Sequence, residues 1–392
     1  TEETPFFFIY SVWTKNGEYR EQVKRLVTDY DNYISLKLAG DDAYLSEKMV
    51  GYPAELDEVY AESFEEQKKE WFSCVGDGIQ ECRNTWEHKK WNITDFPEFE
   101  LAITIDRPEL YYDFLQKDWT RFCHDYWKNN FLEHHTLSQK RVTRIYIGNQ
   151  FCHNLFPRKE LLFQVLEKAL ENNLAVTLAF SYIRNHLLEE IDELLQELEV
   201  WCQSREKEAG KDQEEIIVND WAMPILLQGK PHLKPVLGVL LNKRRKDVRL
   251  PYKQGIGNHV DSLAENNLNC GFYQDYLKNT FDIQRFEFES CGYKVTIPDG
   301  HHSLHLPFFQ TNTSQYCTLY AVCRYGDRGK QKLTENCPRY CNKKVFLYPK
   351  HLKMVGRYNS LFGYDEKILW DEKQLQDYLE QGIERIVVNV SL

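Results

Sequence analysis

Four of the eleven cysteines lie in one short segment near the C-terminal end of the chain, at Cys317, Cys323, Cys337 and Cys341. Two glycines, five Lys or Arg residues and a proline directly after Cys337 lie among them, so we predict a loop rather than a helix or strand of the core. Thiolates in a cationic loop suit a soft metal, because positive charge favours the S⁻ form and a loop can wrap around an ion or cluster. The segment therefore predicts an iron–sulfur cluster, with zinc and redox disulfides as the alternatives.

A fifth thiol, Cys152, follows the strand that we expect over residues 142–148 and stands four residues past Gly148. In a barrel of parallel strands this position lies on the face where active sites gather. The alternative is a half-buried thiol beside Phe151.

The segment 242–249, NKRRKDVR, directly follows another predicted strand. At the end of a barrel strand, Asn242 and Arg244 could hold a carboxylate or phosphate, whereas the alternative is a solvated surface. Asp220 and Glu289, also at strand ends, are candidate carboxylates of the same pocket. Four histidines are further candidates for an acid or base, with a polar turn as the alternative: His259, His301, His302 and His305.

Composition narrows the classes of partner and location. The formal net charge is −11 and the pI is about 5.6, which disfavours nucleic acid as a ligand because phosphate would be repelled. No apolar run approaches the ~20 residues that span a bilayer, and the first residues lack the features of a signal peptide. An odd number of cysteines argues against a disulfide framework. We expect a cytoplasmic protein with no membrane contact.

Apolar strands alternate with amphipathic helices from residue 141 to residue 392. Such alternation is typical of a parallel sheet that is buried on both faces, and seven or eight units favour an α/β, TIM-barrel-like (β/α) barrel over an open sheet. Residues 1–140 are acidic, rich in Trp and mainly helical, so we expect an α-rich N-terminal extension or insertion of unknown role. Its first strand, within residues 5–13, could belong to the barrel.

Several short motifs together resemble a known family. YIGNQFC, VND at 218–220, PVLGVLLN ending at Asn242, YAVC at 320–323 and CPRYC at 337–341 resemble, in this order, the barrel segments of the collagenase-like peptidase family U thirty-two. Within that family the likeness is to the UbiV and UbiU iron–sulfur proteins of oxygen-independent ubiquinone biosynthesis. It covers residues 142 to about 390. Asn149 stands where UbiV-like members carry an acidic residue, and the long N-terminal segment is foreign to the simple members, which indicates a different substrate.

The resemblance implies a 4Fe-4S cluster held by Cys152, Cys323, Cys337 and Cys341, with Cys317 as the rival ligand. It further implies an oxygen-independent hydroxylase or related oxidoreductase that acts on a small organic or peptide substrate. The catalytic pocket would then lie near Asn242, Arg244 and Asp220. The alternatives are a peptidase of the same family and a non-catalytic, cluster-bearing subunit that docks on a protein partner.

Overall fold

The protein is described here by a computed structural model. It describes residues 2–3, 8–9, 13–39, 69, 96–209, 214–248, 264–330, 332–334, 336–348 and 353–390. Much of the expected helical region 1–140 therefore lies outside the described residues, and so do Arg249 and His259.

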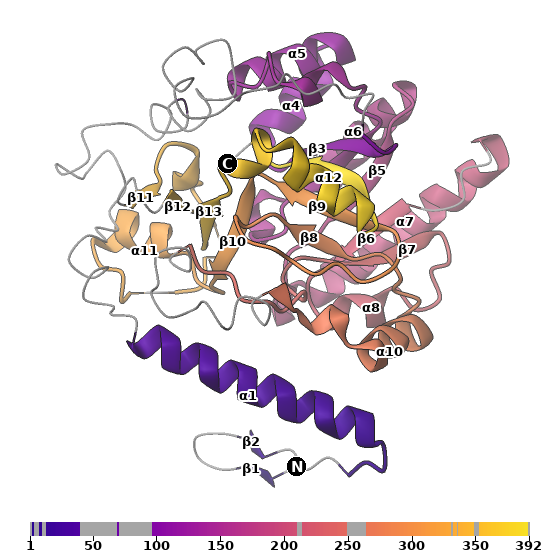
Figure 1. Cartoon of the computed structure of the whole chain (residues 1–392). Coiled ribbons are helices and arrows are strands. Elements are labelled where there is room, and N and C mark those ends of the chain that lie inside the picture. The colour runs from indigo at the N-terminus through magenta and orange to yellow at the C-terminus, as the bar shows by residue number, and fades with distance from the viewer. Residues whose placement is uncertain are drawn as a thin grey trace.

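The centre of the fold is an eight-stranded parallel sheet that curls into a nearly closed barrel (Figure 1). Its order in space is β7-β6-β5-β4-β3-β14-β9-β8, and a parallel bridge between Leu237 and Phe286 joins the two outer strands. The strands are β3 (Glu100–Ile105), β4 (Arg144–Gly148), β5 (Ala175–Ala179), β6 (Glu214–Val218), β7 (Leu233–Leu237), β8 (Glu287–Glu289), β9 (His302–Leu306) and β14 (Ile383–Val388). The expectation of a TIM-barrel-like α/β fold is confirmed at this level.

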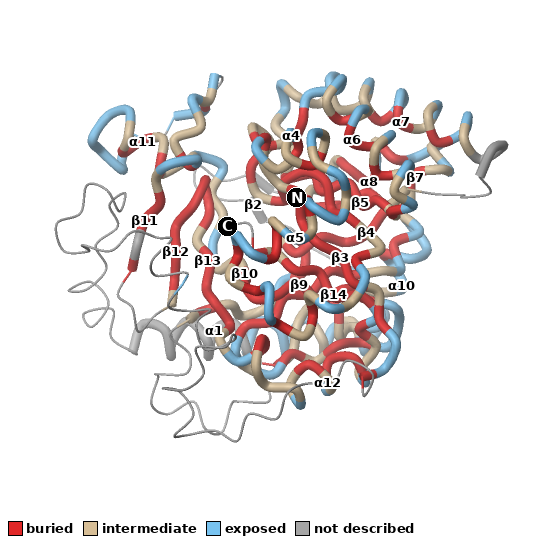
Figure 2. The backbone as a smooth tube through the Cα atoms, turned by 90° about the horizontal axis from the view of Figure 1, so that it is seen from above, coloured by how far each residue is buried: buried red, intermediate tan, exposed pale blue. Residues whose placement is uncertain are grey.

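Helices pack around the barrel in the connections between strands (Figure 1). Their apolar faces supply the outer layer of the core, for example Leu162, Val165 and Leu166 of α6. The helices are α4 (Pro108–Gln116), α5 (Trp119–Asn129), α6 (Lys159–Glu171), α7 (Leu188–Ala209), α8 (Ala222–Leu226), α10 (Gly271–Phe281) and α12 (Glu372–Glu380). Figure 2 shows the strands as the continuously buried part of the chain, with exposure concentrated in the surrounding helices and loops.

A second sheet of four strands, in the order β10-β13-β12-β11, is inserted between β9 and β14. It comprises β10 (Phe308–Thr313), β11 (Phe346–Leu347), β12 (Met354–Arg357) and β13 (Ser360–Tyr364), and its pairs are antiparallel. We call β10–β13 the inserted sheet. It lies beside the barrel in Figures 1 and 2 and carries the cysteine-rich segment between β10 and β11.

The barrel begins earlier in the chain than the sequence indicated. β3 pairs with β4 and with β14, so the sheet includes residues before 141. The segment 99–105 has the apolar pattern of a strand. Because a long helical connection, α4 and α5, follows it, the sequence pattern did not place this strand in the barrel. The boundary at residue 140 is therefore replaced by one before β3.

The described part of the N-terminal region contains β1 (Glu2–Glu3), β2 (Phe8–Ile9) and the long helix α1 (Gly17–Ala39). β1 and β2 pair with each other in a separate antiparallel sheet, so the suggestion that the first strand joins the barrel is wrong. Tyr19 of α1 packs edge-on against Phe272 of α10, with ring centroids 4.9 Å apart.

The cysteine-rich segment is not loop throughout. Residues Thr318–Tyr325 form the helix α11, which buries Leu319, Ala321 and Val322 and ends at Gly326 in the left-handed conformation.

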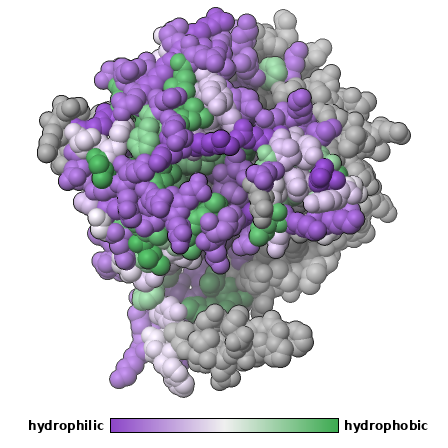
Figure 3. All heavy atoms as spheres, turned by 180° about the vertical axis from the view of Figure 1, so that it is seen from behind, coloured by the Kyte–Doolittle hydropathy of each residue, from purple (hydrophilic) through white to green (hydrophobic). Residues whose placement is uncertain are grey.

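On the face drawn in Figure 3, hydrophilic side chains predominate over the described surface. Among the described residues, no helix is both long and apolar enough to span a membrane.

Candidate functional site at the barrel mouth

A small cavity of about 40 Å³ lies at the carboxyl ends of the barrel strands, where the inserted sheet covers them. It is the position at which barrel enzymes carry their active sites. Strand ends supply most of its wall and the β12–β13 hairpin supplies the rest. The lining residues are Thr104, Asp106, Tyr146, Gly148, Asn149, Gln150, Phe151, Ala179, Val239, Glu289, His305, Tyr358, Phe362 and Asn389.

Tyr358 reaches this mouth cavity from the tight turn between β12 and β13. The pairing of Arg357 with Ser360 leaves Tyr358 and Asn359 as a two-residue turn, and Tyr358 has φ 58°, as such turns require. The Asn359 amide fixes the turn by donating to the carbonyl oxygens of Ser314 at 2.6 Å and Phe151 at 2.8 Å. The turn therefore ties the inserted sheet to the loop after β4.

The Tyr358 hydroxyl is buried, and it has no hydrogen-bond partner among the described residues. Burial, together with the negative charge of Asp106, raises the pKa of Tyr358, against the lowering effect of Arg357 and Arg107. The phenol is therefore protonated at neutral pH and can donate a hydrogen bond. Because an unpaired buried donor is unfavourable by about 1–3 kcal/mol, this hydroxyl is a good candidate for a contact to a ligand.

Glu289 brings a negative charge to the mouth cavity and is held there by several groups. Its carboxylate accepts from Lys246 Nζ at 2.5 Å and from the backbone N–H of Gln310 at 2.8 Å. Burial lowers the pKa of Lys246 although the Glu289 charge opposes this effect. The pair links the segment after β7 to the end of β8 and to the inserted sheet.

Arg244 lies next to this pair but points away from the cavity wall. It donates to the Glu289 carbonyl oxygen at 2.6 Å and to Cys291 Sγ at 3.0 Å, and its side chain is 2 % exposed. Burial alone would lower the pKa of Arg244, but Cys291 and Glu289 raise it. Arg244 therefore makes internal contacts. Among the described residues, it lines neither the mouth cavity nor a second cavity that is described below.

Asn242 and Asp220 also hold the framework of the mouth. The Asn242 amide donates to the Glu287 carbonyl oxygen at 3.1 Å, while its Oδ1 has no partner among the described residues. Asp220 accepts from the backbone N–H of Ala222 at 2.8 Å and of Ile183 at 3.4 Å. These contacts give Asp220 a role in capping the turn after β6, and its part in catalysis remains a prediction.

Four thiols from separate segments lie close to one another beside the mouth. Cys152, Cys317, Cys337 and Cys341 appear as electrostatic neighbours, because Cys317 interacts with the other three and Cys341 with both Cys152 and Cys337. Cys152, which is distant in sequence, thus lies near Cys317, Cys337 and Cys341. We call these four residues the thiol cluster.

Local structure explains how each thiol is placed. The Asn149 side chain accepts from the backbone N–H groups of Phe151 and Cys152, both at 2.9 Å, and fixes the loop after β4. Cys317 caps α11: its Sγ accepts from the Tyr320 N–H at 3.3 Å and donates to the Tyr358 carbonyl oxygen at 3.0 Å. The thiol cluster and the mouth cavity therefore share the same turn.

Cys323 differs from Cys317 in its direction. Six residues along an α-helix correspond to a rotation of about 240°, so Cys323 leaves α11 on another side from Cys317. Both side chains pack against the hydrophobic core. The choice between Cys323 and Cys317 as a ligand stays a prediction.

Burial controls the protonation of these thiols. It raises the pKa of Cys152 to about 11, with Cys337 adding to the effect and Arg184 opposing it. Burial and the neighbouring thiols raise the pKa of Cys341 to about 12, although Arg357 lowers it. Such thiols are protonated at neutral pH and are poor nucleophiles, whereas binding to a metal would displace the protons.

The thiol cluster is not arranged for one ion. In the described residues, no three His, Cys, Asp or Glu side chains form a group that could hold a metal ion. Four thiolates around one Zn²⁺ would lie roughly 3.8 Å apart, because Zn–S bonds are about 2.3 Å long and tetrahedral.

Sequence reasoning missed a charged network inside the barrel below the mouth. Arg385 is fully buried and binds Glu215 through two nitrogens, at 2.7 and 3.1 Å, and Glu100 at 2.6 Å. Glu287 contacts His305 at 2.5 Å and the Tyr146 hydroxyl at 3.1 Å. A charged residue in each of several short apolar strands, as in ELAITI, EEIIV and IERIVV, is the signal that could have indicated it.

This network sets the charge beneath the mouth cavity. Burial would raise the pKa of Glu287, but the hydrogen bond and charge of His305, with Arg385, lower it. His305 lines the mouth cavity while its ring meets Glu287 below. Of the candidate histidines in the described part, His305 is thus at the cavity, whereas His301 is exposed and pairs with Glu384.

The chain was compared with protein-family models, with curated proteins and with solved structures, and none of the three comparisons gives a match.

Proposed function

We propose that the protein is an iron–sulfur oxidoreductase whose thiol cluster, Cys152, Cys317, Cys337 and Cys341, holds a 4Fe-4S cluster beside a substrate site at the barrel mouth. The observation that carries the proposal is the proximity of four thiols, two buried and two partly buried, to the cavity at the barrel mouth. A cluster held by four thiolates supplies electron transfer. The family resemblance implies oxygen-independent hydroxylation of a small organic or peptide substrate.

Three residues that line the mouth cavity would contact the substrate or exchange a proton with it. The Tyr358 hydroxyl donates a hydrogen bond to a substrate oxygen or nitrogen, since it has no partner among the described residues. Glu289, paired with Lys246 and Arg244, offers its carboxylate oxygens as acceptors to a hydrogen-bond donor of the substrate. His305 reaches the cavity from below and can exchange a proton there through its contact with Glu287.

The turn at Tyr358 couples the two parts of the site. Its carbonyl oxygen accepts from Cys317 Sγ, and its side chain faces the mouth cavity. A substrate at the hydroxyl would therefore lie close to the thiol cluster, which is what electron transfer between them requires.

Metal analysis of anaerobically purified protein tests the proposal. We expect about four iron and four sulfide per chain, as a 4Fe-4S cluster contains. Cys317→Ala should lose the iron because Cys317 interacts with the other three thiols of the cluster, whereas Cys323→Ala should keep it because Cys323 leaves α11 on another side. Cys202→Ala, at a buried thiol of α7 outside the cluster, is the matched control.

Circular dichroism of each variant separates loss of the cluster from loss of the fold. Wild-type protein with one zinc and no iron would refute the redox function. Iron that survives Cys317→Ala and disappears in Cys323→Ala would restore Cys323 as the ligand.

A further inference from the structure

A second and larger cavity, of about 330 Å³, lies outside the barrel between α4, α5 and the inserted sheet. Its size falls within the range of small-molecule sites. The lining residues are Arg107, Glu109, Leu110, Asp113, Phe122, Asp125, Tyr126, Asn129, Asn130, Asn342 and Arg357. We call it the side cavity.

The side cavity and the mouth cavity lie on opposite sides of two short segments. Asp106 lines the mouth cavity and the next residue, Arg107, lines the side cavity. In the same way Tyr358 lines the mouth cavity, whereas Arg357 lines the side cavity. The two cavities are therefore neighbours that are separated by a thin wall.

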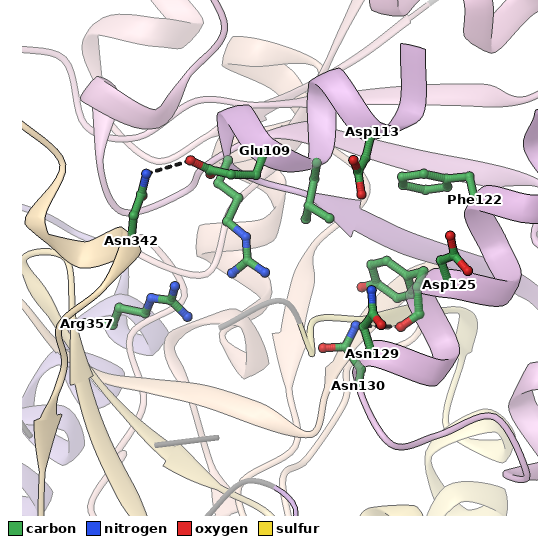
Figure 4. A pocket seen from close by; sticks show the side chains of 11 residues that line it. Glu109, Asp113, Phe122, Asp125, Asn129, Asn130, Asn342 and Arg357 are labelled. Carbon is green, nitrogen blue, oxygen red and sulfur yellow. Dashed lines mark hydrogen bonds between the residues drawn. The ribbon is translucent and has the colours of Figure 1, made fainter. Parts of the chain in front are cut away.

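Arg357 is the feature that indicates a ligand. Its side chain is buried, with the residue 7 % exposed, and Figure 4 shows its guanidinium directed into the cavity. Nε donates to the Cys341 carbonyl oxygen at 3.2 Å, but no carboxylate pairs with Arg357 among the described residues. A buried cation without a counter-charge is unfavourable, so an anionic ligand would stabilise it.

The other charges of the wall have protein partners. Lys117 lies 2.9 Å from the Asp113 carboxylate and 3.1 Å from the Asp125 carboxylate. Glu109 accepts from the Asn342 amide at 2.6 Å, as drawn in Figure 4. Because Glu109, Asp113 and Asp125 are negative, Arg357 is the group of the wall that would bind an anion. The same three carboxylates oppose a ligand that carries two negative charges.

The remaining wall offers hydrogen bonds and an apolar surface. Asn129 and Asn342 present amides, while Phe122 and Tyr126 present aromatic rings. The first turn of α4 also lines the cavity, and the amino end of a helix favours negative charge. Arg107 contributes a second cation near Glu109 and Asp106.

We propose that the side cavity binds a small organic monocarboxylate, with its carboxylate on Arg357 and its polar or aromatic remainder against α5. A guanidinium matches a carboxylate through two parallel hydrogen bonds, and the three wall acids select against a phosphate dianion. This site does not depend on a metal at the thiol cluster.

Isothermal titration calorimetry at low ionic strength tests the proposal with mandelate, which carries one carboxylate, one hydroxyl and one aromatic ring. Mandelamide is the uncharged control ligand, and inorganic phosphate is the competing anion. We expect mandelate to bind the wild type, with mandelamide and phosphate at least tenfold weaker. Absence of mandelate binding, or equal binding of mandelamide, would overturn the proposal.

Two variants test whether mandelate binds in the side cavity. Arg357→Gln, which removes the charge, should weaken mandelate at least tenfold. Arg158→Gln removes a charge from an exposed arginine at the start of α6 and should leave binding unchanged. If Arg357→Gln binds as well as the wild type, the side cavity is not the site; tighter binding of phosphate than of mandelate would show that the ligand class is wrong.

Iron content measured on the same samples separates this proposal from the proposed function. Iron-loaded protein that does not bind mandelate would refute the monocarboxylate site alone. Protein that binds mandelate but contains no iron would refute the iron–sulfur function alone.

Discussion

Replacing Arg385 by methionine should strongly destabilise the barrel. Arg385 is 2 % exposed and places three charged hydrogen bonds on Glu215 and Glu100, at 2.6 to 3.1 Å. Methionine fills a similar volume but leaves both carboxylates with less positive charge. Removing one partner of a buried pair destabilises by about 3–5 kcal/mol. We expect about 3 kcal/mol, because Arg144 still lies 3.3 Å from Glu215.

The pKa of Glu215 gives a second estimate. Burial would raise this pKa, but Arg144 and Arg385 together lower it from 4.5 to about 2. That difference corresponds to roughly 3 kcal/mol of stability that Glu215 contributes near pH 7. Since the folded-state pKa is the lower one, this contribution is fully present above pH 4.5 and is lost as the pH falls toward about 2.

Urea unfolding followed by circular dichroism measures the effect at pH 7 and at pH 3. Arg385→Met should lose about 3 kcal/mol at pH 7 and less at pH 3, where the unfolded state already protonates Glu215. Lys159→Met is the control, because Lys159 and Glu197 form a solvent-exposed pair whose loss should leave the free energy of unfolding nearly unchanged. Arg385→Met/Glu215→Gln should recover part of the loss.

The reasoning is refuted if Arg385→Met unfolds within 1 kcal/mol of the wild type at pH 7, a difference small for a buried pair. A loss of equal size at both pH values would also refute it, since the effect would then come from packing rather than from Glu215.

Two further substitutions test the mouth of the barrel by the same unfolding assay. Gly148→Ala should destabilise by about 2 kcal/mol or more, because Gly148 has φ +107° and an added Cβ would lie 2.5 Å from the Ala179 carbonyl oxygen; a neutral result would show that this strand end can shift. Tyr358→Phe should be neutral or stabilising by up to about 1 kcal/mol, since it removes a buried hydroxyl without a partner among the described residues. A loss of more than 1 kcal/mol would mean that the hydroxyl is satisfied within the protein.

The repeat of strand and helix was predictable because each barrel strand is a short apolar run between helical segments. The place of β3 in the barrel was not predicted, since pairing of β3 with β14 joins residues almost at opposite ends of the domain. Local patterns give the type of an element but not its neighbours. The inserted sheet was missed in part for a related reason: β12 and β13 contain Gly356 and Gly363, which weaken the strand signal.

The thiol cluster shows the same division between pattern and geometry. Spacing gave Cys337 and Cys341 as neighbours, and the family resemblance implied the approach of Cys152 across the barrel. It could not decide between Cys317 and Cys323, because both precede CPRYC and the segment reads as a loop. Formation of α11 gives them different directions, with Cys317 at the N-cap and Cys323 six residues further along.

The inserted sheet is what turns a barrel mouth into a candidate site. It brings Tyr358 over the strand ends and, through the same turn, holds Cys317 by the Tyr358 carbonyl oxygen. Asn359 anchors this turn to the loop that carries Cys152. A movement of the turn would therefore change the spacing of the thiols and the shape of the mouth together, so cluster binding and substrate binding should be coupled through one hairpin.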